Sequence, residues 1–172
     1  YLWIQEFYSA LNENGRAGFV MANSAADARH SEKRIRKNLI EEGVVDVIIS
    51  VSSNFFYTVT LPCTLWFFDK GKKETERENQ VLFIDARNIY RQIDRAHRDY
   101  TEEQLRFISG IVRRYRSEEE VELAIAAEGG EEYESTDSSV TQPEKMNELF
   151  NGNTYRDIPG ICKVATIEDI KE

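Results

Sequence analysis

The 172-residue sequence is poor in cysteine, histidine and proline, and each shortage excludes a class of site. Its two cysteines, Cys63 and Cys162, stand about a hundred positions apart, which is neither a disulfide framework nor a zinc-ligand spacing. Because only His30 and His97 could serve as bases, Cys63 is better explained as a small buried hydrophobe in a strand than as a catalytic thiol. A reducing cytoplasm is the expected location.

Long apolar runs and the common catalytic motifs are also missing. No run approaches the roughly 20 residues that cross a bilayer, so no membrane partner is expected. GxGxxG, GxxxxGK[ST], HExxH and GxSxG are all absent, and the three prolines form no Asn-Pro-Pro tripeptide. By itself the sequence shows no complete catalytic constellation. It assigns no catalytic, cofactor-binding or metal-binding residue, and its start at YLWIQEFYSAL suggests a piece of a longer protein.

The formal net charge of −9 argues against nucleic-acid binding until its distribution is considered. Residues 117–144 contain ten acidic side chains and no Lys or Arg. The remainder holds 21 acidic against 22 basic residues, so it is not barred from contacting a phosphate backbone.

Hydrophobic periodicity predicts alternating helices and strands. Apolar residues at helical spacing predict a helix from Leu2, closed by Gly15 as its C′ residue, and a second helix from about Asp27 to Glu42, ending at Gly43. Thr101 and Gln104 form a capping box ahead of a helix to about Arg116, whose apolar stripe comprises Leu105, Ile108, Ile111, Val112 and Tyr115. Strands are predicted at Arg16–Met21, Val44–Val51, Leu61–Asp69 and Val81–Asp85.

These elements predict an α/β fold with a largely parallel sheet. Pro62 cannot donate a ladder hydrogen bond, so it should mark a strand's start or an edge. The side chains of Trp66, Phe67 and Phe68 alternate within their strand and are expected in the core. The predicted organisation is residues 1–117 as the main domain, an acidic linker over 118–143 and a C-terminal extension over 144–172, with a turn at IPG and a short helix after Ala165.

The order of these segments resembles the methylation (M) subunit of type I restriction-modification enzymes, which are adenine-specific DNA methyltransferases. The likeness rests on NENGRAGFVMANS, EKRIRKNLIEEG, VVDVIISVSSNFFYTVTLPCTLWFFDKGK and ENQVLFIDARNIYRQIDRAHRDYTEEQLRFISGIVRRY, together with the closing DIPGICKVATIEDI. It covers most of the chain apart from the acidic stretch.

The resemblance implies a doubly wound sheet that binds S-adenosylmethionine and carries an Asn-Pro-Pro-aromatic loop, both upstream of this chain. The C-terminal half of that sheet would be present here, with Leu61–Asp69 antiparallel and inserted between Arg16–Met21 and Val44–Val51. In related enzymes an aromatic residue before the final strand packs against the flipped base. The matching position is Phe56, or Tyr57 if the register slips by one. The alternative is that Phe55 and Phe56 merely plug the end of the sheet.

Basic residues recur at helical spacing in several segments. Arg87, Arg91, Arg95 and Arg98 would share one face if their segment is helical, with Asp94 and Asp99 neutralising part of it. Two further stripes comprise Arg29, Lys33, Arg36 and Lys37, and Arg113, Arg114 and Arg116. A solvated helix face is the alternative for each, and His97 is expected to be a surface residue rather than a base. Asn23 falls where the family often has Pro-Asn, but Ala22 replaces the proline, so Asn23 could simply cap a turn.

The leading hypothesis is therefore a C-terminal piece of a type I M subunit that transfers methyl from S-adenosylmethionine to adenine in DNA. Its expected partners are DNA and the specificity and restriction subunits of the same system, and the piece alone is expected to be inactive. The rival is a non-catalytic α/β interaction module that docks a partner through an open sheet edge at Arg16–Met21.

Overall fold

The computed structural model of the chain describes residues 2–22, 31–118, 149–150 and 154–171. Each helix within these ranges is too short or too polar to pass through a bilayer. The elements follow one another as α1 (Leu2–Ala10), β1 (Arg16–Ala22), α2 (Ser31–Glu41), β2 (Val45–Val51), β3 (Cys63–Asp69), the 3-10 helix η2 (Lys70–Glu74), β4 (Gln80–Ala86), β5 (Arg91–Gln92), β6 (Arg98–Asp99), α3 (Glu102–Arg116), β7 (Cys162–Thr166) and α5 (Ile167–Lys171).

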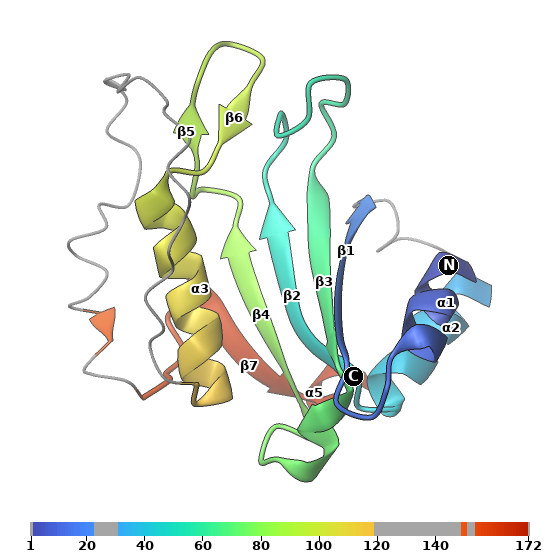
Figure 1. Ribbon diagram of the computed structural model, residues 1–172. Helices are drawn as coiled ribbons and strands as arrows, with labels where there is room; N and C mark the ends of the chain where they lie inside the picture. Colours follow the sequence, from blue (N-terminus) through green and yellow to red (C-terminus); the bar gives the residue numbers. More distant parts are fainter. Residues whose placement is uncertain (1, 23–30, 119–148, 151–153, 172) are drawn as a thin grey trace.

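A five-stranded mixed sheet in the order β1-β3-β2-β4-β7 organises the molecule (Figure 1). Strand β3 is antiparallel to both β1 and β2 and lies between them, which confirms the predicted insertion. The expectation of a largely parallel sheet is wrong, because β2 and β4 form the parallel pair while the other described pairings of this sheet are antiparallel. The segment between β2 and β3 is too short to hold a crossover helix, so β3 has to return antiparallel.

Helices cover both faces of the sheet, giving two apolar layers. Helix α3 packs on one face through Phe107, Ile108 and Ile111, while Ile4 of α1 and Leu39 of α2 pack on the other. The side chains of β3 divide between these layers. Trp66 and Phe68 are buried on the α1/α2 face, whereas Leu65 and Phe67 pack toward the α3 face. The predicted core role of the Trp66–Phe68 run is confirmed.

Local residue chemistry explains several boundaries. Pro62 directly precedes β3, so its missing N–H removes no ladder bond from this interior strand, as predicted. Gly43, two positions after the end of α2, has a φ of +70°, the left-handed conformation that favours glycine at a helix end. The predicted C′ role of Gly15 is wrong: it closes a turn by donating its N–H to Asn12 O at 3.0 Å, five positions beyond the end of α1.

Helix α3 begins at the predicted capping box. The N–H of Gln104 donates to Thr101 Oγ1 and the Gln104 side chain accepts from the Thr101 N–H, while Ser117 ends the helix in the left-handed region. One member of the predicted stripe is misplaced, since Leu105 is exposed and Phe107 takes its place in the core. The sequence also missed β7, which pairs with β4 at the far edge of the sheet, whereas the short helix after Ala165 is present as α5.

Candidate nucleic-acid interface

The predicted site residues gather at one end of the sheet. Strands β2 and β4 are parallel, so their carboxyl ends lie at the same end of the sheet, called here the carboxyl end. Two segments lie at the carboxyl end of the sheet (Figure 1). They are residues 52–62, which follow β2, and the β5–β6 hairpin, which follows β4. The carboxyl end of the sheet therefore carries both the predicted base-stacking aromatics and the predicted DNA-binding arginines.

Three consecutive aromatic residues in this segment have different surroundings. Phe55 is partly buried and packs against Tyr100 with ring centroids 4.6 Å apart. Phe56 is 42% exposed, and Tyr57 is 90% exposed with its ring 5.0 Å from that of His97. Plugging the end of the sheet thus describes Phe55, whereas Phe56 keeps much of its side chain open to solvent.

The segment carrying the four arginines is not helical, so the predicted helical stripe is wrong. Arg91 pairs with Asp99 and Gln92 with Arg98 in a two-stranded antiparallel hairpin. Its turn is fixed by the Asp94 carboxylate, which accepts the backbone N–H of Ala96 at 2.7 Å and of His97 at 2.9 Å. An aspartate that bonds backbone two residues ahead favours a turn over a helix, and this local bond overrides the arginine spacing.

The four arginines are held in different ways. Arg87 is exposed, and its Nε and Nη2 donate hydrogen bonds to the two carboxylate oxygens of Asp85. These hydrogen bonds lower the pKa of the Asp85 carboxyl. Arg91 Nε donates to Asp99 Oδ1 at 2.8 Å, so Asp99 neutralises one arginine as expected. Asp94 instead bonds His97 Nδ1. Arg95 is exposed, whereas Arg98 is half-buried among residues of the segment after β2.

The other residues that the sequence singled out contribute less to the carboxyl end of the sheet. Asn23, Arg29 and His30 lie outside the described residues, as do the side chain of Lys33 and nearly all of the acidic stretch. Cys63 is buried at the start of β3, and burial raises the pKa of its thiol, which fits a packing role. Arg116, a member of the third basic stripe, is bound to Asp46 inside the molecule.

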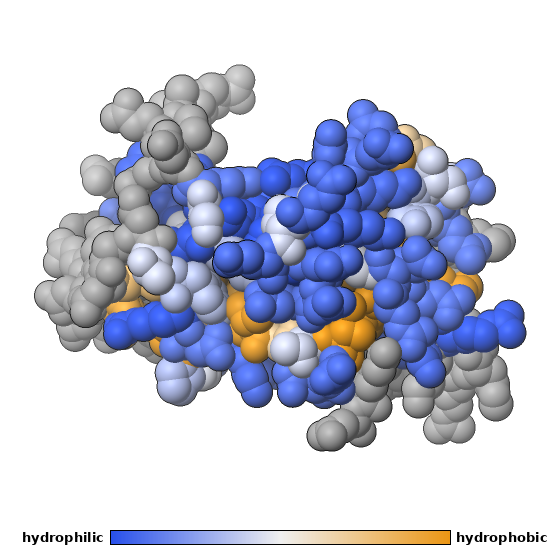
Figure 2. All heavy atoms as spheres, turned by 90° about the horizontal axis from the view of Figure 1, so that it is seen from below, coloured by the Kyte–Doolittle hydropathy of each residue, from blue (hydrophilic) through white to orange (hydrophobic). Residues whose placement is uncertain are grey.

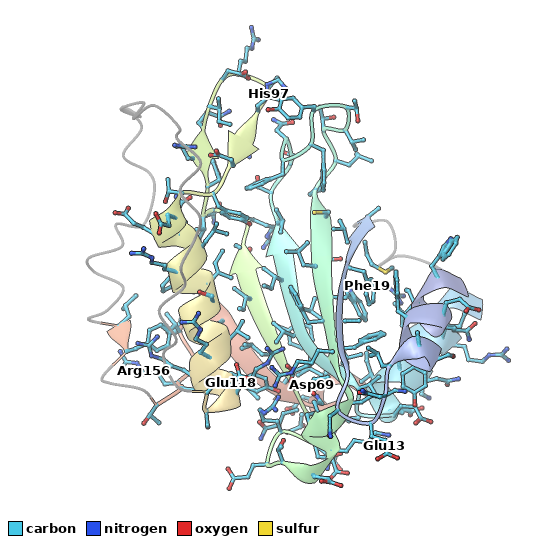
Figure 3. The ribbon with its side chains drawn as sticks, in the orientation of Figure 1. Glu13, Phe19, Asp69, His97, Glu118 and Arg156 are labelled. Carbon is cyan, nitrogen blue, oxygen red and sulfur yellow. The ribbon has the colours of Figure 1, made fainter. Side chains whose placement is uncertain are left out.

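A buried ionic cluster, missed by sequence reasoning, occupies the opposite end of the sheet (Figure 3). Asp46, with no exposed surface, accepts from Arg77 Nη1 at 2.6 Å and from Arg116 Nε at 2.8 Å. Asp69 accepts from Arg16 Nε at 3.1 Å, and Arg77 lies 3.5 Å from the same carboxylate. The signal was a single acidic residue inside the apolar run VVDVIISV, since a buried carboxylate requires partners.

Lys72 of η2 completes this cluster. Its fully buried Nζ donates to the carbonyl oxygens of Val45 and Gln80, and burial lowers the pKa of its ammonium to about 8. Asp46 and Asp69 partly oppose that shift. Seen from this end, the surface is mainly hydrophilic (Figure 2). The cluster ties β2, β3, η2 and the end of α3 together.

A groove of about 480 Å³ lies against the paired strands β4 and β7, beside the turn that precedes β7. Its lining combines Phe83 and Asp85 of β4 with the turn Ile158–Ile161 and Lys163. Neither Phe56 nor Tyr57 lines it, so the groove is separate from the predicted base-stacking position.

Comparisons with known proteins place this geometry in a family. The whole chain, residues 1–172, matches the family described as N-6 DNA Methylase. It is 36% identical over 170 residues to the type I restriction enzyme MjaIX methylase subunit of Methanocaldococcus jannaschii, covering 99% of this chain and 25% of that protein. It is 28% identical to the HindI methylase subunit of Haemophilus influenzae, covering 99% of this chain and 30% of that protein.

Solved structures share the fold. The type I restriction-modification methyltransferase subunit of Streptococcus thermophilus superposes with a TM-score of 0.63 at 20% identity, over 99% of this chain and 27% of that one. A second, described as showing complex assembly and conformational transition of the type I R-M system, gives 0.58 at 10% identity, over 99% and 29%. The chain spans less than a third of the length of these relatives, and it belongs to the N-6 DNA Methylase family.

Proposed function

We propose that this chain forms the carboxyl-terminal part of a type I methylation subunit that methylates the exocyclic amine of adenine in DNA. Family membership over residues 1–172 and 36% identity to the MjaIX methylase subunit support a methyltransferase of this kind. S-adenosylmethionine would supply the methyl group. The chain has neither a glycine-rich nor an Asn-Pro-Pro motif, so we assign the cofactor site to other parts of the intact subunit.

The observation that carries the proposal is the partly exposed position of Phe56 at the carboxyl end of the sheet. An enzyme that modifies a base must extract it from the duplex, and an aromatic face can hold the extruded base. Phe56 offers such a face, because its side chain is 42% exposed while the preceding Phe55 anchors the segment against Tyr100. Tyr57, already paired with His97, is the alternative base contact.

Arginines near the carboxyl end of the sheet are proposed as DNA contacts. Arg87, Arg91 and Arg95 present guanidinium groups on the hairpin and its approach, and guanidinium groups suit bidentate phosphate contacts. The specificity and restriction subunits of the same system are the proposed protein partners. The naming of the relatives as type I restriction enzyme subunits supports this.

Replacing Phe56 with alanine in the intact methyltransferase should reduce methylation about 5- to 150-fold while sparing duplex affinity, since stacking one base on an aromatic ring contributes about 1–3 kcal/mol. The measurement is methyl transfer from labelled S-adenosylmethionine to duplex DNA, alongside binding of the same duplex. Val59→Ala is the matched control, because Val59 lies in the same segment with a similar exposure of 44% but has no aromatic face. Equal turnover of Phe56→Ala and the unaltered enzyme would remove the base-stacking role.

A second candidate function is supported by the free edge of β1. This strand pairs with β3 on one side, and no other described strand pairs with it. Val20 of β1 and Trp3 of α1 are exposed, the latter to 76%. An open edge beside exposed apolar groups can pair with another chain, so a protein-interaction module remains a rival proposal.

Sedimentation of the 172-residue chain over a rising concentration range tests this rival. An interaction surface at β1 predicts self-association that weakens when Val20 is changed to lysine, because a charge on an edge strand opposes pairing. Val59→Lys, an equally sized change outside β1, in the segment between β2 and β3, is the control. A monomer at every concentration would count against the interaction module.

A further inference from the structure

We propose that Arg98 is a positioning residue for the segment that presents Phe56, rather than a phosphate contact. This inference rests on the proposed function and deepens it. It differs from the expectation that Arg98 acts with Arg87, Arg91 and Arg95 as part of one DNA-binding stripe.

The guanidinium of Arg98 is engaged by neighbouring residues of the protein. Nε donates to Gln92 Oε1 at 2.9 Å, Nη1 donates to Ser52 Oγ, and the group lies 4.0 Å from the centroid of the Tyr90 ring. Ser52 is itself buried, directly after the end of β2. A guanidinium with two acceptors and an aromatic stacking partner is fixed in orientation and has little freedom to follow a phosphate.

The backbone of Arg98 reaches the same segment at a second point. Its N–H donates to Asn54 O at 2.9 Å. Asn54 has φ 69, in the left-handed region that asparagine tolerates better than most residues, and here the chain turns away from β2. Arg98 therefore holds the segment at Ser52 with its side chain and at Asn54 with its backbone, two positions before Phe56.

Aromatic contacts on both sides of Phe56 complete the attachment. Phe55 packs against Tyr100, which follows the hairpin, and Tyr57 packs against His97 in the hairpin turn. Figure 3 shows His97 at the tip of this end of the molecule. Phe56 lies between two residues that are each attached to the hairpin. The hairpin thus acts as a brace that presents Phe56 in one arrangement before DNA arrives, and preorganisation of this kind favours the chemical step.

The test compares Arg98→Met, Arg98→Lys and Ser52→Ala in the intact methyltransferase. Positioning predicts that all three lower kcat several-fold with duplex affinity unchanged, because a lysine keeps the charge but cannot form the same set of contacts. It also predicts that Arg98→Met combined with Ser52→Ala is little worse than Arg98→Met alone, since both remove one interaction. Arg106→Met removes the same charge from the exposed face of α3 and should leave kcat unchanged.

A phosphate contact predicts the opposite pattern. Arg98→Met would then weaken binding and reduce the salt dependence of affinity by about one ion, as expected for Arg95→Met, while Arg98→Lys would retain most activity and Ser52→Ala would be silent. That pattern would overturn the proposal.

Hydrogen exchange in the 172-residue chain separates this inference from the proposed function. Faster exchange across residues 53–60 in both Arg98→Met and Ser52→Ala, with global stability retained, supports the brace even if Phe56→Ala leaves methylation intact. Unchanged exchange in Ser52→Ala would overturn it, and this conservative variant keeps the test valid if Arg98→Met does not fold.

Discussion

Replacing Asp46 with asparagine is expected to lower the free energy of unfolding of the chain by about 3–5 kcal/mol. The substitution keeps the shape of the side chain but removes the negative charge that Arg77 and Arg116 share. Those arginine side chains are only 11% and 13% exposed, so water cannot replace the carboxylate. Asp46 also falls at the irregularity where β2 shifts register against β3.

Urea or thermal unfolding of the 172-residue chain measures this loss. Asp85→Asn is the matched control. Like Asp46, Asp85 forms an ion pair with an arginine, but this pair lies at the surface, where the Arg87 side chain is 61% exposed. The control should change stability by no more than about 1 kcal/mol, the usual range for an exposed ion pair. Similar losses at the two positions would show that burial of the Asp46 network contributes little.

Regular apolar runs made much of the fold predictable. VVDVIISV and TLWFF have the β-branched and aromatic content of covered strands, and Pro62 marked the start of the second. The antiparallel insertion of β3 followed from the family resemblance rather than from periodicity. Strand β7 escaped because five residues between a Pro-Gly turn and a short helix give little periodic signal, although Cys162 and Val164 do alternate with Lys163.

The candidate site was less predictable because its geometry depends on contacts distant in sequence. The spacing of Arg91, Arg95 and Arg98 fits a helix as well as it fits a hairpin, and the bonds of Asp94 to its own backbone decide between them. Nothing within FFY indicates that Phe55 is anchored and Phe56 exposed, since the anchor is Tyr100. The buried ionic cluster likewise joins residues from β2, β3 and α3.

A second large effect is expected in the dependence of stability on pH, and it arises from Lys72. Burial lowers the pKa of its ammonium from 10.5 to about 8, with Arg77 adding to the shift and Asp46 and Asp69 opposing it. Between these two values the unfolded chain binds a proton that the folded chain has released. The free energy of unfolding therefore rises with pH through this window, by about 1.4 kcal/mol per pH unit and about 3 kcal/mol in all.

Lys72→Met isolates this contribution. The difference in unfolding free energy between the unaltered chain and the variant should grow by about 2 kcal/mol from pH 8 to pH 9.5 in favour of the unaltered chain. Measurement stops there because burial raises the pKa of Tyr100 and Tyr115, so that tyrosines of the unfolded chain, with a pKa near 10, ionise first and stability falls at higher pH.

Lys73→Met is the control, since Lys73 is the next residue but is 44% exposed and sits 3.8 Å from Glu42. Its difference from the unaltered chain should stay flat over the same range. NMR titration of the lysine side-chain nitrogens gives the pKa of Lys72 directly. A value near 10.5, or a flat difference for Lys72→Met, would mean that the amine is solvated in the folded chain. A value near 8 fits the geometry, because a neutral amine has two N–H groups and Lys72 Nζ donates to two carbonyl oxygens, those of Val45 and Gln80.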